Sequence, residues 1–72
     1  MTRRFEMEEG GSRKFWEVAR DGREVTVRYG RIGSAGQSKV KSLADEDEAR
    51  GHVSGLVEEK VGKGYREVAP IA

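Results

Sequence analysis

The chain has 72 residues, and a domain of this size hides only about 60% of the surface that its unfolded form exposes. It contains no cysteine, which excludes disulfides and thiolate chemistry, and its single histidine, His52, excludes a metal site with several histidine ligands. The net charge is only +1, but residues 1–41 contain ten lysines and arginines against six acidic residues. This basic half indicates either a surface for an anionic partner or a solvated sheet face of mixed sign.

The first forty residues alternate between apolar and polar side chains, with the period-2 pattern of β-strands. We expect four strands, near residues 3–8, 14–19, 24–29 and 37–42. Asp21-Gly22 is predicted to be a two-residue hairpin turn, because both residue types tolerate a positive φ. Trp16 and Val18 share one face of the second strand, and we interpret Trp16 as a core residue rather than a stacking platform.

The period changes after Ser42. An apolar stripe with helical spacing predicts an amphipathic helix over about residues 44–61, and its members are Ala49, Val53, Leu56, Val57 and Val61. The segment from Ser42 to Asp45 fits a variant capping box that would begin this helix, and Gly62 and Gly64 are available to end it. Gly51 and Gly55 lie on one side of the helix, where we expect them to allow close approach to the sheet.

A short closing strand over residues 65–68, ended by Pro70, is expected after the helix. The fold class is therefore α+β: a single domain over residues 1–72, with a curled antiparallel β-meander of four to five strands and one α-helix packed on it. No apolar run approaches the ~20 residues that span a membrane, and the N-terminus lacks a signal peptide. We expect a cytoplasmic monomer with no membrane partner.

The sequence does not support catalysis. Gly62-Lys63-Gly64 lacks the spacing of a phosphate-binding loop, and nothing fixes a nucleophile beside His52. The consecutive acidic residues 45–48 point in different directions around a helix, so a solvated helix start explains them better than a metal cluster. We expect no catalytic residue, no metal and no cofactor.

Residues 27–38, VRYGRIGSAGQS, place Arg31 between two glycines directly after an aromatic residue. In one interpretation Gly30 and Gly33 expose backbone to a sugar-phosphate chain, with Arg31 as phosphate ligand and Tyr29 as stacking platform. In the other, the glycines form the bulge and turn that end a twisted strand, and Arg31 braces the loop. The residues alone leave both interpretations open and favour the structural one.

The tract VRYGRIGSAGQSKVKSL, followed by DEDEAR and LVEEKVGKGY, resembles the WGR domain, a family named for a Trp-Gly-Arg motif. The resemblance spans nearly the whole chain and includes the aromatic pair Phe15-Trp16. The motif departs from the family at its first position, where Tyr29 gives Tyr-Gly-Arg. In break-sensing members of the family the motif aromatic packs on a terminal nucleotide, so the resemblance implies DNA contact by Tyr29 and Arg31.

The combined prediction is a small non-catalytic nucleic-acid-binding module that contacts DNA ends or backbone, with RNA as an open alternative. The candidate nucleic-acid-binding residues are Tyr29, Gly30, Arg31, Arg28, Lys39, Lys41, Lys60 and Lys63. The rival prediction is a protein–protein adaptor that docks another polypeptide through the same loop.

Overall fold

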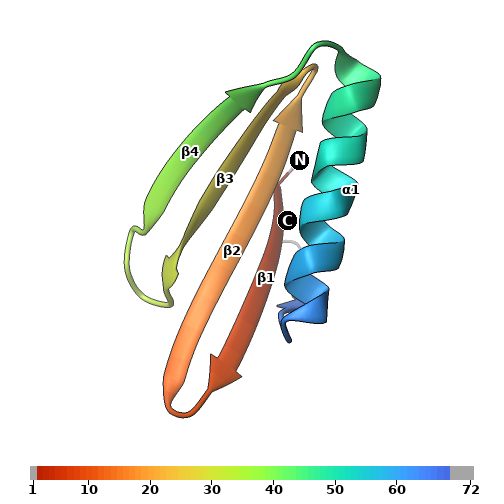
Figure 1. The fold of residues 1–72 in the computed structure, drawn as a ribbon. Coiled ribbons are helices and arrows are strands. Elements are labelled where there is room, and N and C mark those ends of the chain that lie inside the picture. The colour runs from red at the N-terminus through yellow and green to blue at the C-terminus, as the bar shows by residue number, and fades with distance from the viewer. Residues whose placement is uncertain (1, 69–72) are drawn as a thin grey trace.

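Five antiparallel strands and one helix make up residues 2–68, the part of the chain that the computed structural model describes (Figure 1). The elements are β1 (Thr2–Glu9), β2 (Ser12–Asp21), β3 (Glu24–Arg31), β4 (Gln37–Ser42), α1 (Glu46–Gly62) and β5 (Arg66–Glu67). The strand order is β4-β3-β2-β1-β5, so a four-strand meander is followed by a helix and a strand that returns beside β1. The predicted α+β meander with one packed helix is confirmed.

The hairpin between β2 and β3 turns one residue later than predicted. Asp21 pairs with Glu24, so the two central turn residues are Gly22 and Arg23 rather than Asp21 and Gly22. Gly22 has a φ of 60° and Arg23 does not enter the positive range. A two-residue turn with a positive φ only at its first central position favours glycine there, and this preference sets the register.

The core lies between α1 and the sheet. Its buried residues are Phe5, Trp16, Val18, Val25, Leu43 and Ala49. Trp16 is only 3% exposed, which confirms its assignment to the core. Val53, Leu56 and Val57 are half-buried and pack against this cluster, as the helical stripe predicts. Val61 departs from the stripe, since 54% of it is exposed near the end of the helix.

The helix begins two residues later than predicted. Asp45 is its N-cap, and the Glu48 N–H donates to the Asp45 side chain at 2.8 Å. Ser42 instead ends β4, and the Leu43 N–H donates to the Arg23 carbonyl at 2.9 Å, which holds this segment against the sheet. The sequence from Asp45 to Glu48 (Asp-x-x-Glu) is itself a capping sequence. The helix therefore starts after Asp45, next to its acidic first turn, and not after Ser42.

The expectation for the two helix glycines is wrong. A Cβ placed on Gly51 or Gly55 would meet no atom within 4 Å, so neither glycine mediates close packing on the sheet. The apolar stripe faces the sheet, and both glycines lie on exposed parts of α1. At the C-terminal end Lys63 is the C-cap and Gly64 follows with a φ of 106°, the left-handed conformation that ends many helices.

The strand β5 is fastened to β1 by a two-point ion pair. The Arg3 guanidinium donates two hydrogen bonds of 2.8 Å to the Glu67 carboxylate. These bonds lower the pKa of Glu67 and raise the pKa of Arg3. Pro70, expected to end this strand, lies outside the described residues. Within residues 2–68 no helix is both long and apolar enough to cross a membrane.

Candidate nucleic-acid interface

The alternation of side chains along β3 divides the motif between the two faces of the sheet. Tyr29 stands opposite Trp16 of the core and Arg31 stands opposite Lys14, so these residues belong to the side covered by α1, here called the helix face. Arg28 and Gly30 belong to the other side, here called the open face. The side chains of Tyr29 and Arg31, the aromatic and the arginine of the motif, therefore lie on the same face of the sheet.

Arg28 is separated from the other candidate residues and braces the open face. Its guanidinium donates to both carboxylate oxygens of Glu17 at 3.0 and 3.1 Å and to the Ala35 carbonyl at 2.9 Å. It also lies 5.0 Å from the ring centroid of Phe15. These contacts use the guanidinium donors within the fold, so the structure groups Arg28 with the framework of the sheet.

Gly30 and Gly36 allow the loop after β3 to fold onto the open face. A Cβ on Gly30 would lie 2.8 Å from the Gly36 Cα. Gly36 has a φ of 71°, and a Cβ there would lie 2.8 Å from the Phe15 Cζ and 2.5 Å from the Tyr29 carbonyl oxygen. The space beside Gly30 is thus filled by the chain itself, and Phe15 is only 1% exposed. Close packing of this loop explains both glycines.

Gly33 makes the turn that ends β3. It has a φ of 97°, and the Ser34 N–H and hydroxyl both donate to the Arg31 carbonyl, at 3.0 and 2.7 Å. A positive φ at the third residue of a hydrogen-bonded turn favours glycine. The turn holds the Arg31 backbone, while its exposed side chain makes no hydrogen bond or ion pair within residues 2–68.

A groove of about 510 Å³ lies on the helix face between α1 and β4. Its lining includes Trp16, Val25, Val27 and Leu56 of the apolar interior. The basic residues that line it are Lys39 and Lys41 of β4 and Lys60 of α1, and Glu59 and His52 of α1 line it as well. In Figure 1, β4 is the strand farthest from α1, so the helix does not cover the β4 end of the helix face.

A second hollow of about 340 Å³ adjoins the groove, because Tyr29 lines both. It also contains Lys14, Arg31 and Tyr65. The half-buried Tyr29 therefore lies between two sets of cations. The Lys39 Nζ is 5.8 Å from the centroid of the Tyr29 ring, near enough for a cation–π interaction.

Lys60 links the two hollows. Its Nζ lies 5.7 Å from the centroid of the Trp16 ring and 5.6 Å from that of Tyr65. Aromatic rings on two sides hold the ammonium group near the floor of the groove. Lys63, by contrast, pairs with Glu59 at 3.3 Å and lines neither hollow. Of the predicted lysines, the structure brings together Lys39, Lys41 and Lys60.

Five cations around these hollows form no ion pair among the described residues: Lys14, Arg31, Lys39, Lys41 and Lys60. We call them the helix-face cations. Sequence reasoning missed Lys14 and Tyr65. The signal for Lys14 was the hairpin register, since a turn centred on Gly22 and Arg23 places Lys14 opposite Arg31.

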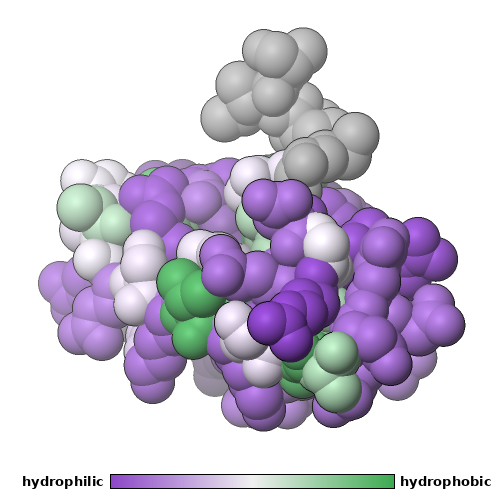
Figure 2. Space-filling model, turned by 90° about the horizontal axis from the view of Figure 1, so that it is seen from above, coloured by the Kyte–Doolittle hydropathy of each residue, from purple (hydrophilic) through white to green (hydrophobic). Residues whose placement is uncertain are grey.

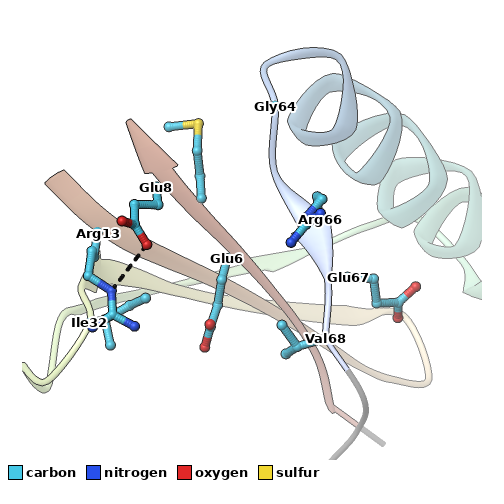
Figure 3. Close-up of a pocket in the computed structure, with 9 residues that line it drawn as sticks. Glu6, Glu8, Arg13, Ile32, Gly64, Arg66, Glu67 and Val68 are labelled. Carbon is cyan, nitrogen blue, oxygen red and sulfur yellow. Dashed lines mark ion pairs between the residues drawn. The ribbon is translucent and has the colours of Figure 1, made fainter. Parts of the chain in front are cut away.

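A different hollow, of about 500 Å³, lies at the β1–β5 edge and carries charges of both signs (Figure 3). Arg13 and Glu8 form an ion pair of 3.7 Å there, and Glu6 accepts a hydrogen bond of 2.8 Å from Arg4. Its mixed charge does not select an anionic ligand. Among residues 2–68 no group of His, Asp and Glu side chains could hold a metal ion.

Comparison with known proteins shows to which family this fold belongs. The family model for the WGR domain matches residues 1–71 of the chain. The chain belongs to the WGR domain family. Its fold is similar to part of the crystal structure of a Bacteroides fragilis protein, with a TM-score of 0.92 and 38% identity. That match covers 96% of this chain and 20% of the other.

Two Escherichia coli K12 proteins, YfeS and YehF, are also similar to this WGR domain. They are 34% and 39% identical to it over 67 residues, which is 93% of this chain in each case. The alignments cover 28% of YfeS and 24% of YehF. The WGR domain described here therefore spans about a quarter of the length of the curated relatives that it matches.

Proposed function

We propose that this WGR domain is a non-catalytic module that binds nucleic acid, with DNA as the preferred partner, through its helix face. The family is known for nucleic-acid-binding modules, which supports the general class. The observation that carries the proposal for this chain is the group of helix-face cations around Tyr29, none of which forms an ion pair in the described part of the chain; Glu59, the one carboxylate that lines these hollows, pairs with Lys63 instead. Unpaired cations grouped on one face provide the counterion-releasing contacts that a polyanion needs.

Each part of the helix face has a distinct task in this proposal. Arg31 offers a planar guanidinium that can donate two hydrogen bonds to one phosphate, with Lys14 beside it as a point charge. Lys39 and Lys41 continue the positive track along β4. Tyr29 packs against the core and presents only the exposed part of its ring, which suits contact with a sugar or with the edge of a base.

The rival function is a protein–protein adaptor, and the apolar lining of the groove favours it. Val25, Val27 and Leu56 would contact an apolar side chain of a partner. Salt separates the two functions, because an interface of this kind loses little affinity when salt is added, whereas phosphate contacts release counterions.

The test is a titration of the domain into a fluorescein-labelled blunt-ended duplex, followed by fluorescence anisotropy over a series of salt concentrations. We expect the logarithm of the association constant to fall linearly with the logarithm of salt, with a slope of roughly −0.9 for each phosphate contacted. NMR amide shifts should concentrate at Tyr29, Arg31 and residues 37–41.

Unlabelled single-stranded DNA and duplex RNA, added as competitors, establish which nucleic acid is preferred. Absence of binding at low salt would contradict the proposal. So would amide shifts confined to the open face around Arg28 and Glu17.

A further inference from the structure

The strand β4 is a free edge of the sheet within the described residues. It is the outermost strand of the order β4-β3-β2-β1-β5, and all six of its residues are exposed. Such an edge presents unpaired backbone N–H and C=O groups that another strand can join. The opposite edge differs, because β5 pairs with part of β1 and the Arg3–Glu67 ion pair joins the two strands.

The side chains of β4 specify what an added strand must look like. Lys39 stands opposite Val27 and Lys41 opposite Val25, so both lysines belong to the helix face. Val40 lies between them on the open face and is 61% exposed. A strand that paired with this edge would complement it best with carboxylates opposite the lysines and an apolar β-branched residue opposite Val40.

A second copy of this chain is a poor occupant of the edge. If two β4 strands paired antiparallel about Val40, with both helices on the same side of the joined sheet, Lys39 of each copy would face Lys41 of the other. Shifting the pairing by two residues places identical lysines opposite each other. Like charges directly opposite in a sheet are destabilising, so the lysines oppose self-association.

We propose that the β4 edge binds an extended acidic segment of a partner protein by β-strand addition. Aspartate or glutamate at alternate positions pairs with Lys39 and Lys41, and the residue between them packs on Val40. The backbone of the segment supplies the hydrogen bonds, as in other cases of strand addition. This interaction goes beyond the proposed binding of nucleic acid: it shares Lys39 and Lys41 with that surface and adds the backbone edge of β4, so the two partners compete for these lysines.

Val40 and the backbone groups of the β4 edge distinguish an acidic peptide from a nucleic acid as the partner of this edge. A phosphate backbone would pair with Lys39 and Lys41, but it would leave Val40 and the row of backbone groups without partners. Lysines spaced two residues apart on one side of a strand match the period of an acidic strand.

The probe is a short end-blocked peptide in which glutamate alternates with valine, and its matched control contains lysine in place of glutamate. We expect the acidic peptide to shift the NMR signals of residues 37–42 and to slow hydrogen exchange of their amides. The Lys39→Glu/Lys41→Glu variant should reverse the preference and bind the basic peptide, with each peptide favoured by roughly tenfold on its own partner.

Two results would overturn the proposal: equal affinity for both peptides, or β4 amides that shift with the DNA duplex and do not shift with the acidic peptide. In the latter case the lysines serve nucleic acid and protect the edge from aggregation. A measurement without peptide gives a second test. The single Lys39→Glu variant makes the edge self-complementary, because its new carboxylates face Lys41 of another copy, and it should dimerise in analytical ultracentrifugation. A variant that remains monomeric would show that the edge does not pair.

Discussion

On the open face of the sheet, Arg4 and Arg28 lie 4.5 and 5.0 Å from the centroid of the Phe15 ring, and both pair with Glu17. On the helix face, Lys14 and Arg31 stand opposite each other without a carboxylate partner in the described part of the chain. Like charges that face each other across two strands cost free energy, whereas the open-face arginines are neutralised. The two faces of the sheet therefore differ in whether their cations are paired with carboxylates, and not only in how many cations they carry.

The floor of the helix face is core, and the largest expected effect tests that assignment. Trp16 is 3% exposed and packs on Phe5 with ring centroids 5.5 Å apart. Trp16→Ala should lower the free energy of unfolding by about 3–5 kcal/mol, which unfolds most domains of this size. Circular dichroism melting measures the loss. An unchanged melting temperature would make Trp16 a surface platform.

The next largest loss of stability is expected in the open-face loop, where a second glycine of the same loop is the matched control. Gly36 and Gly33 both have a positive φ, but only Gly36 is packed against Phe15 and the Tyr29 carbonyl. Gly36→Ala should therefore destabilise the domain by clearly more than Gly33→Ala, which carries only the left-handed strain of about 1 kcal/mol. Equal losses in urea unfolding would mean that the loop does not close on Phe15.

Removing the shared carboxylate of the open face should turn that face into a weak anion-binding surface. Glu17→Gln removes the carboxylate that Arg4 and Arg28 share, at a cost of about 1–3 kcal/mol in stability; Arg28 then has no carboxylate partner among the described residues, while Arg4 keeps Glu6. The variant should bind duplex DNA more tightly than the wild type at low salt, with new amide shifts around Phe15. Glu8→Gln, which removes the same charge from an exposed pair, is the control. Equal gains for the two variants would show that net charge alone matters.

Much of the fold could be predicted from the sequence, because local patterns determine it. Alternation along β1 to β4 and the stripe through Val53 and Leu56 are both consequences of burying one side of each element. The turn and the helix start were each misplaced by one or two residues, because Asp21-Gly22-Arg23 and Ser42 to Asp45 contain competing signals. Local preference does not decide between adjacent turn or cap positions; the pairing of neighbouring strands does.

The candidate site was less predictable, because it depends on which charges find partners. Tyr29, Arg31, Lys39, Lys41 and Lys60 do lie around the two adjoining hollows. The pairing of Arg28 with Glu17 joins residues on two strands, and the closure of Gly36 over Phe15 is tertiary packing. Neither follows from spacing along the chain. The exposure of Gly51 and Gly55, by contrast, does follow from helical spacing, because both lie on the side of the helix opposite the apolar stripe.

The outer side of α1 belongs to neither face of the sheet, and substitutions there should have the smallest effect on the stability of the domain. A Cβ on Gly51 or Gly55 would meet open space, and neither glycine has a positive φ. Gly51→Ala and Gly55→Ala should each stabilise the domain by about 0.5–1 kcal/mol, because alanine favours the helix. Duplex affinity should not change. A loss of DNA binding in either variant would place the interface on the helix exterior instead.

The most direct test of the helix-face account compares two exposed arginines that have no ion pair in the described residues. Arg31 lies on the helix face, and Arg66 lines the mixed-charge hollow at the β1–β5 edge. Anisotropy titrations over a salt series should show that Arg31→Ala weakens duplex binding by about 1–3 kcal/mol and reduces the salt slope by roughly one unit. Arg66→Ala should leave both nearly unchanged, and both variants should keep the wild-type melting temperature. Coinciding binding curves for the two variants, or a sharp fall in the melting temperature of Arg31→Ala, would contradict the account.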